Sequence, residues 1–268
     1  MMRMLKRVRD SGRSGQASRL WPACLLLIGP LLLLCPDGPA QAAEVRMAFG
    51  EKIPPFCFPK TDSGIELEVI RAALAYKGHQ LKPLYFPFAR IPVSFRDGTV
   101  DAVMTDLGQD LSSAGGHYAD PAVLYDNVFI TLSRRQIKIS TPADLKGLSV
   151  VSFAGAIKRY PEWLEPVRRA GLYTEINDQS VQVKTLMLGR YDVVLSDRNI
   201  FKYFALQLKS EGFTELQPVD ETAFVKLNPQ DYRPVFRDPR IRDDFNQGLK
   251  QLKESGRFQA IYDKYLKD

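Results

Sequence analysis

Residues 95–106, FRDGTVDAVMTD, pass from the end of a helix through a turn into a buried strand. A short helix is predicted over residues 92–96, and Asp97-Gly98 closes it, because glycine readily adopts the backbone that ends a helix. The apolar run at residues 100–104 predicts a buried strand. A helix that leads directly into a buried strand is the repeating unit of an α/β fold.

The residues before this stretch show the same alternation. Strands are predicted at residues 45–49 and 80–86. The helix between them begins after Gly64, where apolar residues recur at helical spacing as far as Leu74. The resulting order of strand, helix, strand, helix and strand predicts a mostly parallel sheet with helices on its faces.

A second series of the same kind follows a strand predicted at residues 128–133. Its elements are predicted as strand 149–153, helix 163–170, strand 173–176, helix 181–188, strand 192–195 and helix 200–209. Two amphipathic helices, marked by apolar residues from Phe245 to Tyr265, end the chain. The sequence therefore predicts an α/β protein of two similar lobes, each a mostly parallel sheet flanked by helices.

The first 42 residues have the pattern of a secretory signal peptide. Basic residues precede an apolar run at residues 23–34, and the small-residue sequence Ala40-Gln41-Ala42 follows. The run is shorter than the roughly 20 residues that span a bilayer, which disfavours an uncleaved anchor. Leu34 stands where a lipoprotein has a small residue before its cysteine, so lipidation of Cys35 is not expected. We predict cleavage after Ala42 and export to the periplasm.

Charge and cysteine content narrow the function classes. The formal charge of the chain is +6, and residues 1–42 contribute +4 of it, so residues 43–268 carry only +2. This balance gives no indication of nucleic-acid binding. Cys57 has no cysteine partner after residue 42, so we expect a buried, inert thiol in preference to a reactive one.

Seven segments, in this order, resemble the family 3 bacterial extracellular solute-binding proteins, the receptors of polar amino acid ABC importers. They are IPPFCF (53–58), GIELEV (64–69), FRDGTVDAVMTD (95–106), YADPAVLYDNVFITL (118–132), PADLKGLSVVSFAG (142–155), LGRYDVVLSD (188–197) and GLKQLKESGRFQAIYDKYL (248–266).

The resemblance implies a type II periplasmic binding fold with a hinge of two chain crossings. Residues 43–133 and 222–268 would form the first lobe, and residues 134–221 the second. A solute that contacts both lobes would favour their closed arrangement, which the inner-membrane permease would recognise. The resemblance also implies a monomeric receptor that is not an enzyme and needs no cofactor, metal or nucleic acid.

The resemblance places aromatic or apolar side chains on the walls of a ligand site. Aligned on IPPF, Ile53 stands where the family usually has an aromatic residue that stacks on the ligand, and Phe56 is close by. Phe88 falls on another wall. Packing in the protein core is the alternative role for each of these residues.

Polar candidates lie where strands end. Thr105 and Asp106 follow a buried strand at its carboxyl end, where open α/β sheets bind ligands, although Asp106 is also placed to cap a helix. By the resemblance, Asp197 matches the acid that holds the ammonium group of the ligand. A charge-assisted hydrogen bond suits that role.

The usual carboxylate site of the family is missing from this sequence. Asp110-Leu111-Ser112-Ser113 replaces the segment that carries the carboxylate-binding arginine, and Gly155-Ala156-Ile157 replaces a Gly-Thr-Thr turn, so Ala156 stands where a hydroxyl would bind. Either the solute is not a standard α-amino acid, or another cation binds its carboxylate. Arg90 and Arg159 are the candidates, each with a solvated surface position as the alternative, and Lys158 is expected at the surface.

Two other classes of function remain to be weighed. An enzyme has little support, because the two histidines, His79 and His117, stand in no metal-binding or nucleophile motif. An accessory protein of another periplasmic system, such as a quinoprotein dehydrogenase, fits the altered carboxylate site better. The sequence favours a receptor for a small polar, nitrogen-containing solute such as an amino acid or a derivative.

Overall fold

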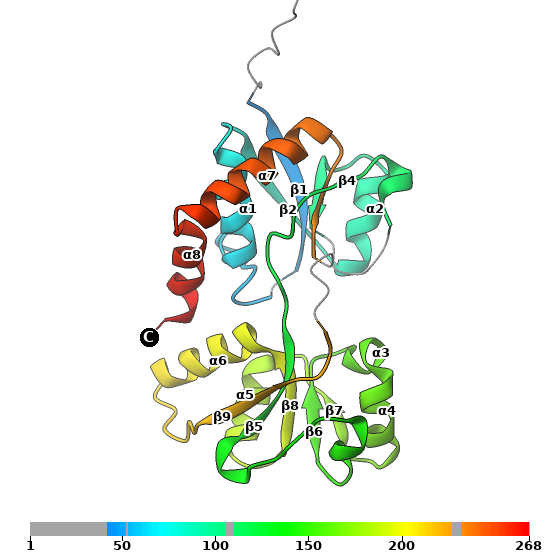
Figure 1. Ribbon diagram of the computed structural model, residues 1–268, viewed down its shortest axis with the longest axis vertical. Coiled ribbons are helices and arrows are strands. Elements are labelled where there is room, and N and C mark those ends of the chain that lie inside the picture. Colours follow the sequence, from blue (N-terminus) through cyan, green and yellow to red (C-terminus); the bar gives the residue numbers. More distant parts are fainter. Residues whose placement is uncertain (1–41, 52, 105–109, 227–231, 268) are drawn as a thin grey trace, which may run out of the picture. The chain divides into compact units, whose positions relative to one another are not determined.

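The computed structural model describes residues 42–51, 53–104, 110–226 and 232–267, and two five-stranded sheets organise them (Figure 1). In the first lobe the strands are ordered β2 (Gln80–Phe86), β1 (Glu44–Gly50), β3 (Ala102–Met104), β10 (Pro234–Phe236) and β4 (His117–Tyr118). In the second lobe they are ordered β7 (Tyr173–Glu175), β6 (Val150–Ser152), β8 (Val193–Asp197), β5 (Asn127–Leu132) and β9 (Val219–Ala223).

Helices cover both sheets. Those of the first lobe are α1 (Ile65–Ala75), α2 (Ile91–Arg96), α7 (Pro239–Glu254) and α8 (Arg257–Leu266). Those of the second are α3 (Ala156–Arg159), α4 (Pro161–Arg169), α5 (Gln179–Met187) and α6 (Arg198–Ser210). Short 3₁₀ turns are η1 (Phe88–Arg90), η2 (Ser112–Ala114), η3 (Ser133–Arg135) and η4 (Pro142–Leu145).

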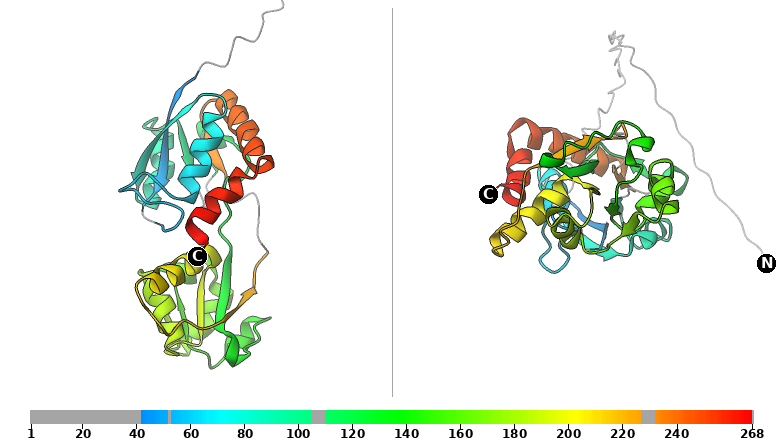
Figure 2. Two further views of the ribbon diagram at one scale, coloured as in Figure 1. Left: turned by 90° about the vertical axis from the view of Figure 1, so that its left-hand side faces the viewer. Right: turned by 90° about the horizontal axis from the view of Figure 1, so that it is seen from below.

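Alternation along β1 builds the two apolar layers of the first lobe. Val45, Met47 and Phe49 pack into the cluster that includes α1 and α7, which lie side by side in Figures 1 and 2. Ala48 packs into the opposite cluster, where Phe95 of α2 lies. Successive side chains of a strand point to opposite faces, so this one short strand contributes to both layers.

The second sheet is covered in the same way. Val128 and Ile130 of β5 join the cluster that includes α5 and α6, whereas Phe129 joins the cluster that includes α4. Phe129 is fully buried and its ring centroid lies 5.4 Å from that of Trp163. Both faces of the sheet are therefore apolar, as expected for a sheet between two layers of helices.

The α/β class, the two-lobed architecture and the type II fold predicted from the sequence are confirmed. The sheets, however, are mixed, because each combines two parallel with two antiparallel pairings, in place of the predicted mostly parallel ones. Strand β5, which the sequence analysis grouped with the first lobe, pairs with β8 and β9 and so belongs to the second sheet.

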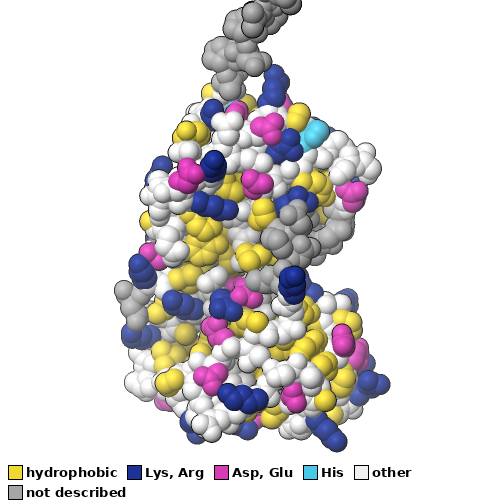
Figure 3. All heavy atoms as spheres, in the orientation of Figure 1, with side chains coloured by type: hydrophobic (Ala, Val, Ile, Leu, Met, Phe, Trp, Pro, Cys, Tyr) yellow, Lys and Arg dark blue, Asp and Glu magenta, His cyan; other side chains and the backbone are white. Residues whose placement is uncertain are grey.

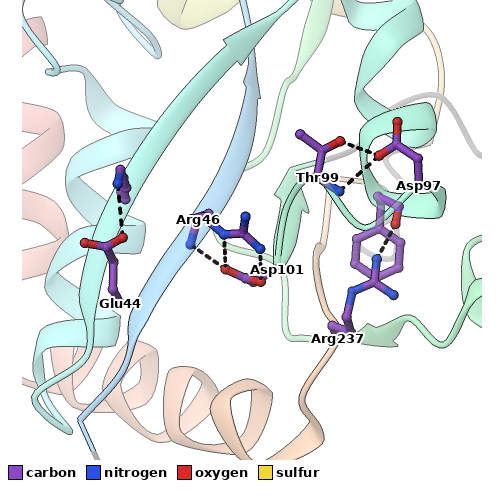
Figure 4. Close-up of polar contacts among 8 residues, drawn as sticks. Glu44, Arg46, Asp97, Thr99, Asp101 and Arg237 are labelled. Carbon is purple, nitrogen blue, oxygen red and sulfur yellow. Dashed lines mark hydrogen bonds and ion pairs between the residues drawn. The ribbon is translucent and has the colours of Figure 1, made fainter.

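An ion pair ties β1 to the start of β3 (Figure 4). The carboxylate of Asp101 accepts hydrogen bonds from Nε and Nη2 of Arg46, at 2.9 and 2.8 Å, and from its backbone N–H at 3.0 Å. These bonds hold the pKa of Asp101 below its usual value. In addition, the carbonyl of Asp101 accepts from the backbone N–H of Arg237, so one residue of the 95–106 stretch links three strands.

The surface carries both signs of charge. On the face shown in Figure 3, basic and acidic side chains are interspersed over both lobes, which agrees with the small net charge of residues 43–268. Within the described ranges, no helix has the length and apolar character needed to cross a membrane.

Candidate functional site

A cavity of about 790 Å³ is lined by residues of both lobes, all within the single compact unit that the described residues form. Its volume suits a small molecule. From the first lobe come Gly50, Ile53, Cys57, Glu66, Phe88, Met104 and Tyr232; from the second come Asn127, Phe153, Ala154, Gly155, Lys158, Arg159, Asn177, Gln179, Asp197 and Ile200; Tyr125 precedes β5.

Asp197 is the most deeply buried acid of this cavity, with 2% of its surface exposed. It ends β8 and caps α6, and its Oδ1 accepts the backbone N–H groups of Asn199 and Ile200, both at 2.9 Å. Its Oδ2 accepts the N–H of Asp126 at 2.6 Å. Burial raises the pKa of Asp197 to about 7 despite these three hydrogen bonds. The carboxylate is thus fixed in place, and its charge is costly unless a cation approaches.

Glu66 is a second buried acid on the cavity wall, with 5% of its surface exposed. It lies in the first turn of α1, and its Oε2 accepts the hydroxyl of Tyr125 at 2.9 Å. Burial raises the pKa of Tyr262, and the negative charges of Asp197 and Glu66 raise it further. Both acids therefore act on one partly buried phenol, and both line the cavity.

Aromatic rings packed at tilted angles support this region. The ring centroid of Tyr125 lies 4.3 Å from that of Phe56 and 4.9 Å from that of Tyr232. The guanidinium of Arg159 lies 5.4 Å from the centroid of the Tyr232 ring and donates a hydrogen bond to its hydroxyl. Arg159 is also 5.9 Å from the ring centroid of Tyr160. The cation is held by aromatic faces, an arrangement that arginine favours.

Phe88 forms another part of the wall by lying over the backbone of β1. A Cβ atom at Gly50 would come within 2.4 Å of the Phe88 ring, so only glycine allows this ring to approach the strand. Phe88 keeps 37% of its surface exposed. Ile53 lies in a tight turn, in which its carbonyl accepts the backbone N–H of Cys57 at 2.9 Å.

Four residues predicted from the sequence line the cavity: Ile53, Phe88, Arg159 and Asp197. Their role in binding remains a prediction. Two others are placed outside the lining because they are fully buried: Phe56 packs on Tyr125, and Ala156 lies in the core against α4.

Arg90, the preferred cation of the sequence analysis, is not brought to the cavity. It is exposed in η1, and its charge helps to lower the pKa of Asp97 beyond the end of α2, after the hydrogen bonds from Thr99. Arg159 occupies the cavity in its place. The predicted ligand residues Thr105 and Asp106 lie outside the described residues.

The turn that replaces Gly-Thr-Thr binds a carboxylate of the protein itself. Oε2 of Glu175 accepts the backbone N–H of Gly155 at 2.8 Å, and Oε1 accepts that of Ile157 at 3.2 Å. The hydroxyl of Tyr173 donates to Oε1 at 2.8 Å. The pKa of Glu175 is lowered overall. Burial by itself would raise it, but these hydrogen bonds and the positive charge of Lys158 have the larger combined effect.

Sequence reasoning missed Glu66, Tyr125, Tyr232 and Glu175. An acid directly after the Pro-Pro loop, in the first turn of a helix, was a usable signal for Glu66. The other three residues lie in connecting segments or on a short strand, where periodicity carries little information about tertiary position.

The chemically reactive side chains Cys57 and His79 are held in buried positions. Burial raises the pKa of Cys57 to about 12, so its thiol is protonated at neutral pH. His79 is buried and hydrogen-bonds to Asp244 and to the N–H of Ala43. Among the described residues, no three histidine, cysteine or acidic side chains come together in a way that could hold a metal ion. The cavity combines fixed charges with aromatic walls, which suits binding.

Solved structures with the same fold are numerous. The second substrate-binding domain of Lactococcus lactis GlnP, in an open conformation, has a TM-score of 0.61 and 22% identity, covering 86% of this chain and 97% of that one. An ancestral cationic amino acid solute-binding protein has a TM-score of 0.62 and 18% identity, covering 84% and 96%. A histidine kinase sensor domain with similarity to periplasmic binding proteins has a TM-score of 0.57 and 16% identity, covering 84% and 96%.

These identities are low enough that the likeness shows the fold alone. A comparison with curated proteins found no match. The family model of the bacterial extracellular solute-binding proteins, family 3, matches residues 45–268, which is most of the chain. The chain belongs to the bacterial extracellular solute-binding proteins, family 3.

Proposed function

We propose that this protein is a periplasmic receptor that delivers a small polar, nitrogen-containing solute to an ABC importer. The observation that carries the proposal is Asp197, a carboxylate with 2% exposure that is fixed by three backbone donors and lines the cavity. A cationic nitrogen of the solute would occupy the remaining lone-pair direction of this carboxylate. The pair would be shielded from water and would form a strong, charge-assisted hydrogen bond.

The cavity also explains how binding would be signalled. Its walls come from both lobes, so a bound solute contacts both and stabilises the arrangement in which they enclose it. The neighbouring rings of Tyr125 and Tyr232 give the solute an apolar surface beside the charged groups. An inner-membrane permease would then discriminate between the enclosed and the free forms.

The location of this receptor follows from the N-terminal pattern. Residues 1–42 would be removed after Ala42, leaving Ala43 one residue ahead of β1. The protein would act as a monomer in the periplasm. N-terminal sequencing of the exported protein checks the position of cleavage.

One observation favours a second function, that of an accessory or sensory binding protein without a transport role. The amides of the 155–157 turn are already occupied by Glu175, so the site differs from an amino-acid receptor in a central feature. An accessory protein that binds another macromolecule would need no small solute in its cavity. The two functions therefore differ in whether the protein binds a small solute.

A solute screen provides the test. Residues 43–268, unfolded and refolded to remove any carried solute, are expected to melt at higher temperature with an amino acid, polyamine or other small amine. A solute at about 100 times its Kd stabilises the folded state by about 2.7 kcal/mol, which corresponds to roughly 5–10 °C for a protein of this size. Differential scanning fluorimetry measures the shift.

Small organic acids without nitrogen serve as the negative set for this screen. A melting temperature that stays constant with every nitrogenous solute contradicts the receptor function and favours the accessory one.

A further inference from the structure

A buried histidine of the first lobe has no part in the proposed solute site. His79 has 4% of its surface exposed, lies between α1 and β2, and is not part of the cavity lining. Its backbone N–H donates to the carbonyl of Leu74 at 3.2 Å, which fixes it to the end of α1. A buried imidazole needs hydrogen-bond partners for its ring nitrogens, so its partners indicate what the residue does.

The two partners of the His79 ring come from distant parts of the sequence. Nδ1 lies 3.2 Å from the backbone nitrogen of Ala43, whose N–H donates to it. Nε2 lies 3.0 Å from Oδ2 of Asp244 on α7, whose side chain is only 15% exposed. A backbone N–H can only donate, so Nδ1 accepts and Nε2 carries the proton that is donated to Asp244. The ring thus connects Ala43 to a carboxylate.

Ala43 is held on its other side as well. Its carbonyl accepts the backbone N–H of Gln80 at 2.9 Å. The next residue, Glu44, begins β1 and pairs with Gln80 at the start of β2. The ends of a chain are poorly ordered unless contacts of this kind hold them. Both polar backbone groups of Ala43 are therefore bound by two consecutive residues, His79 and Gln80.

The predicted cleavage after Ala42 would change the donor of the hydrogen bond to His79. Ala43 would become the first residue, and its amide nitrogen would become an α-ammonium group, which is charged at neutral pH because its usual pKa is about 7.7–8.0. This group could still donate to Nδ1, and the Asp244 carboxylate beyond the ring would attract its charge. A charge-assisted hydrogen bond is about twice as strong as a neutral one.

We propose that His79 and Asp244 form a binding site for the α-ammonium group of the mature chain, so that removal of the leader stabilises the first lobe. This inference rests on the predicted cleavage after Ala42, which is part of the proposed function. Before cleavage His79 accepts a neutral N–H, and after cleavage it accepts a cation at the same position. Processing of the N-terminus is thereby coupled to the core that β1 shares with α7.

Two forms of the protein that differ only in where the chain begins test the inference. One begins at Ala43. The other keeps Gln41-Ala42 ahead of it, so that Ala43 still donates an amide N–H and the ammonium group lies elsewhere. Both are released from a fusion by a protease that leaves no extra residue. At pH 7, the form that begins at Ala43 is expected to melt roughly 2–4 °C higher in differential scanning calorimetry.

Asp244→Asn assigns this difference to the histidine site. Asparagine keeps an oxygen that can accept from Nε2 of His79 but removes the negative charge, so the two forms of this variant are expected to melt within about 1 °C of each other. Each comparison is made within one variant. Any stability that the substitution itself costs therefore cancels.

Asp243→Asn is the matched control. Asp243 is the adjacent, exposed acid of α7 and pairs with Arg242, so its loss changes the net charge equally without touching His79. The two forms of this variant are expected to differ as much as those of wild type. Equal melting temperatures of the two wild-type forms overturn the inference, and so does the same difference in all three proteins.

N-terminal sequencing of the exported protein separates this inference from the proposed function. A chain that begins at Ala43 supports the role of the site in maturation. A chain that begins at another residue overturns that role together with the predicted cleavage position, and leaves solute binding intact. A solute screen without any binding, in turn, overturns the receptor function and leaves the ammonium site intact.

Discussion

Replacing Asp197 with asparagine is expected to weaken binding of a cationic solute about 30-fold or more at pH 8, the usual effect of removing one charge from a buried pair. The pKa of Asp197 is raised to about 7 by burial, and a bound cation requires the ionised carboxylate. Affinity of wild type is therefore expected to fall about tenfold for each pH unit below 7 and to be constant above pH 8. Asp197→Asn is expected to lose this dependence.

Calorimetry of solute binding measures both effects. At pH 6.5, about three-quarters of the free protein carries the Asp197 proton, so wild type is expected to release about 0.75 proton on binding, which appears as a heat that varies with the ionisation enthalpy of the buffer. Asp197→Asn is expected to release none from this site. Unchanged affinity of the variant at pH 8 contradicts the role of Asp197 and leaves it as the cap of α6 alone.

The same residue makes a distinct prediction for stability. Because the folded pKa of Asp197 lies above the unfolded value of about 3.9, the folded state binds the proton more tightly. Its contribution to the free energy of unfolding is therefore greatest below pH 4 and is lost as the pH rises to 7. Asp197→Asn lacks this titration, so its stability relative to wild type is expected to increase over that range. Asp197→Ala also loses the helix cap, at a cost of about 1 kcal/mol.

The order of strands and helices could be predicted because each apolar face repeats along the chain. Val45, Met47 and Phe49 alternate, and the residues of α1 recur at helical spacing, so local pattern and burial agree. Sheet membership of β5 was harder to predict. A fully apolar strand fits the interior of either sheet, and only its antiparallel pairing with β8 decides between them.

The candidate site could be predicted in part by matching short segments to the family, as for Ile53 and Asp197. Asp197 ends β8, and the resemblance had matched it to a ligand residue through the segment LGRYDVVLSD that finishes there. The direction of Arg90 depends on the η1 turn, and that of Glu175 on the pairing of β7 with β6, neither of which leaves a repeating pattern in the sequence. The resemblance showed that the carboxylate site was altered, but could not show that Glu175 fills it.

Replacing Gly248 with alanine is expected to destabilise the first lobe by about 3 kcal/mol, through direct contact between two helices. Gly248 is buried in α7, and a Cβ atom there would lie 1.9 Å from the carbonyl oxygen of Ala73 and 3.0 Å from Cβ of Tyr76. Both contacts belong to α1 or its end. The oxygen is part of the helix backbone, so no side-chain rotation relieves the clash and α7 itself must move.

Movement of α7 disturbs the core that this helix shares with the first sheet. Phe245 and Leu249 flank Gly248 and are buried in the cluster that includes β1. Alanine stabilises a helix by about 1 kcal/mol relative to glycine. The expected net loss of about 3 kcal/mol is therefore the cost of the clash minus this gain. A decrease of roughly 6–12 °C in melting temperature is expected by calorimetry.

Gln247→Ala is the control, because Gln247 is exposed on the same helix. This variant is expected to change stability by less than about 0.5 kcal/mol. A Gly248→Ala variant as stable as this control would contradict the prediction. It would mean that α1 and α7 can move apart at no cost in stability.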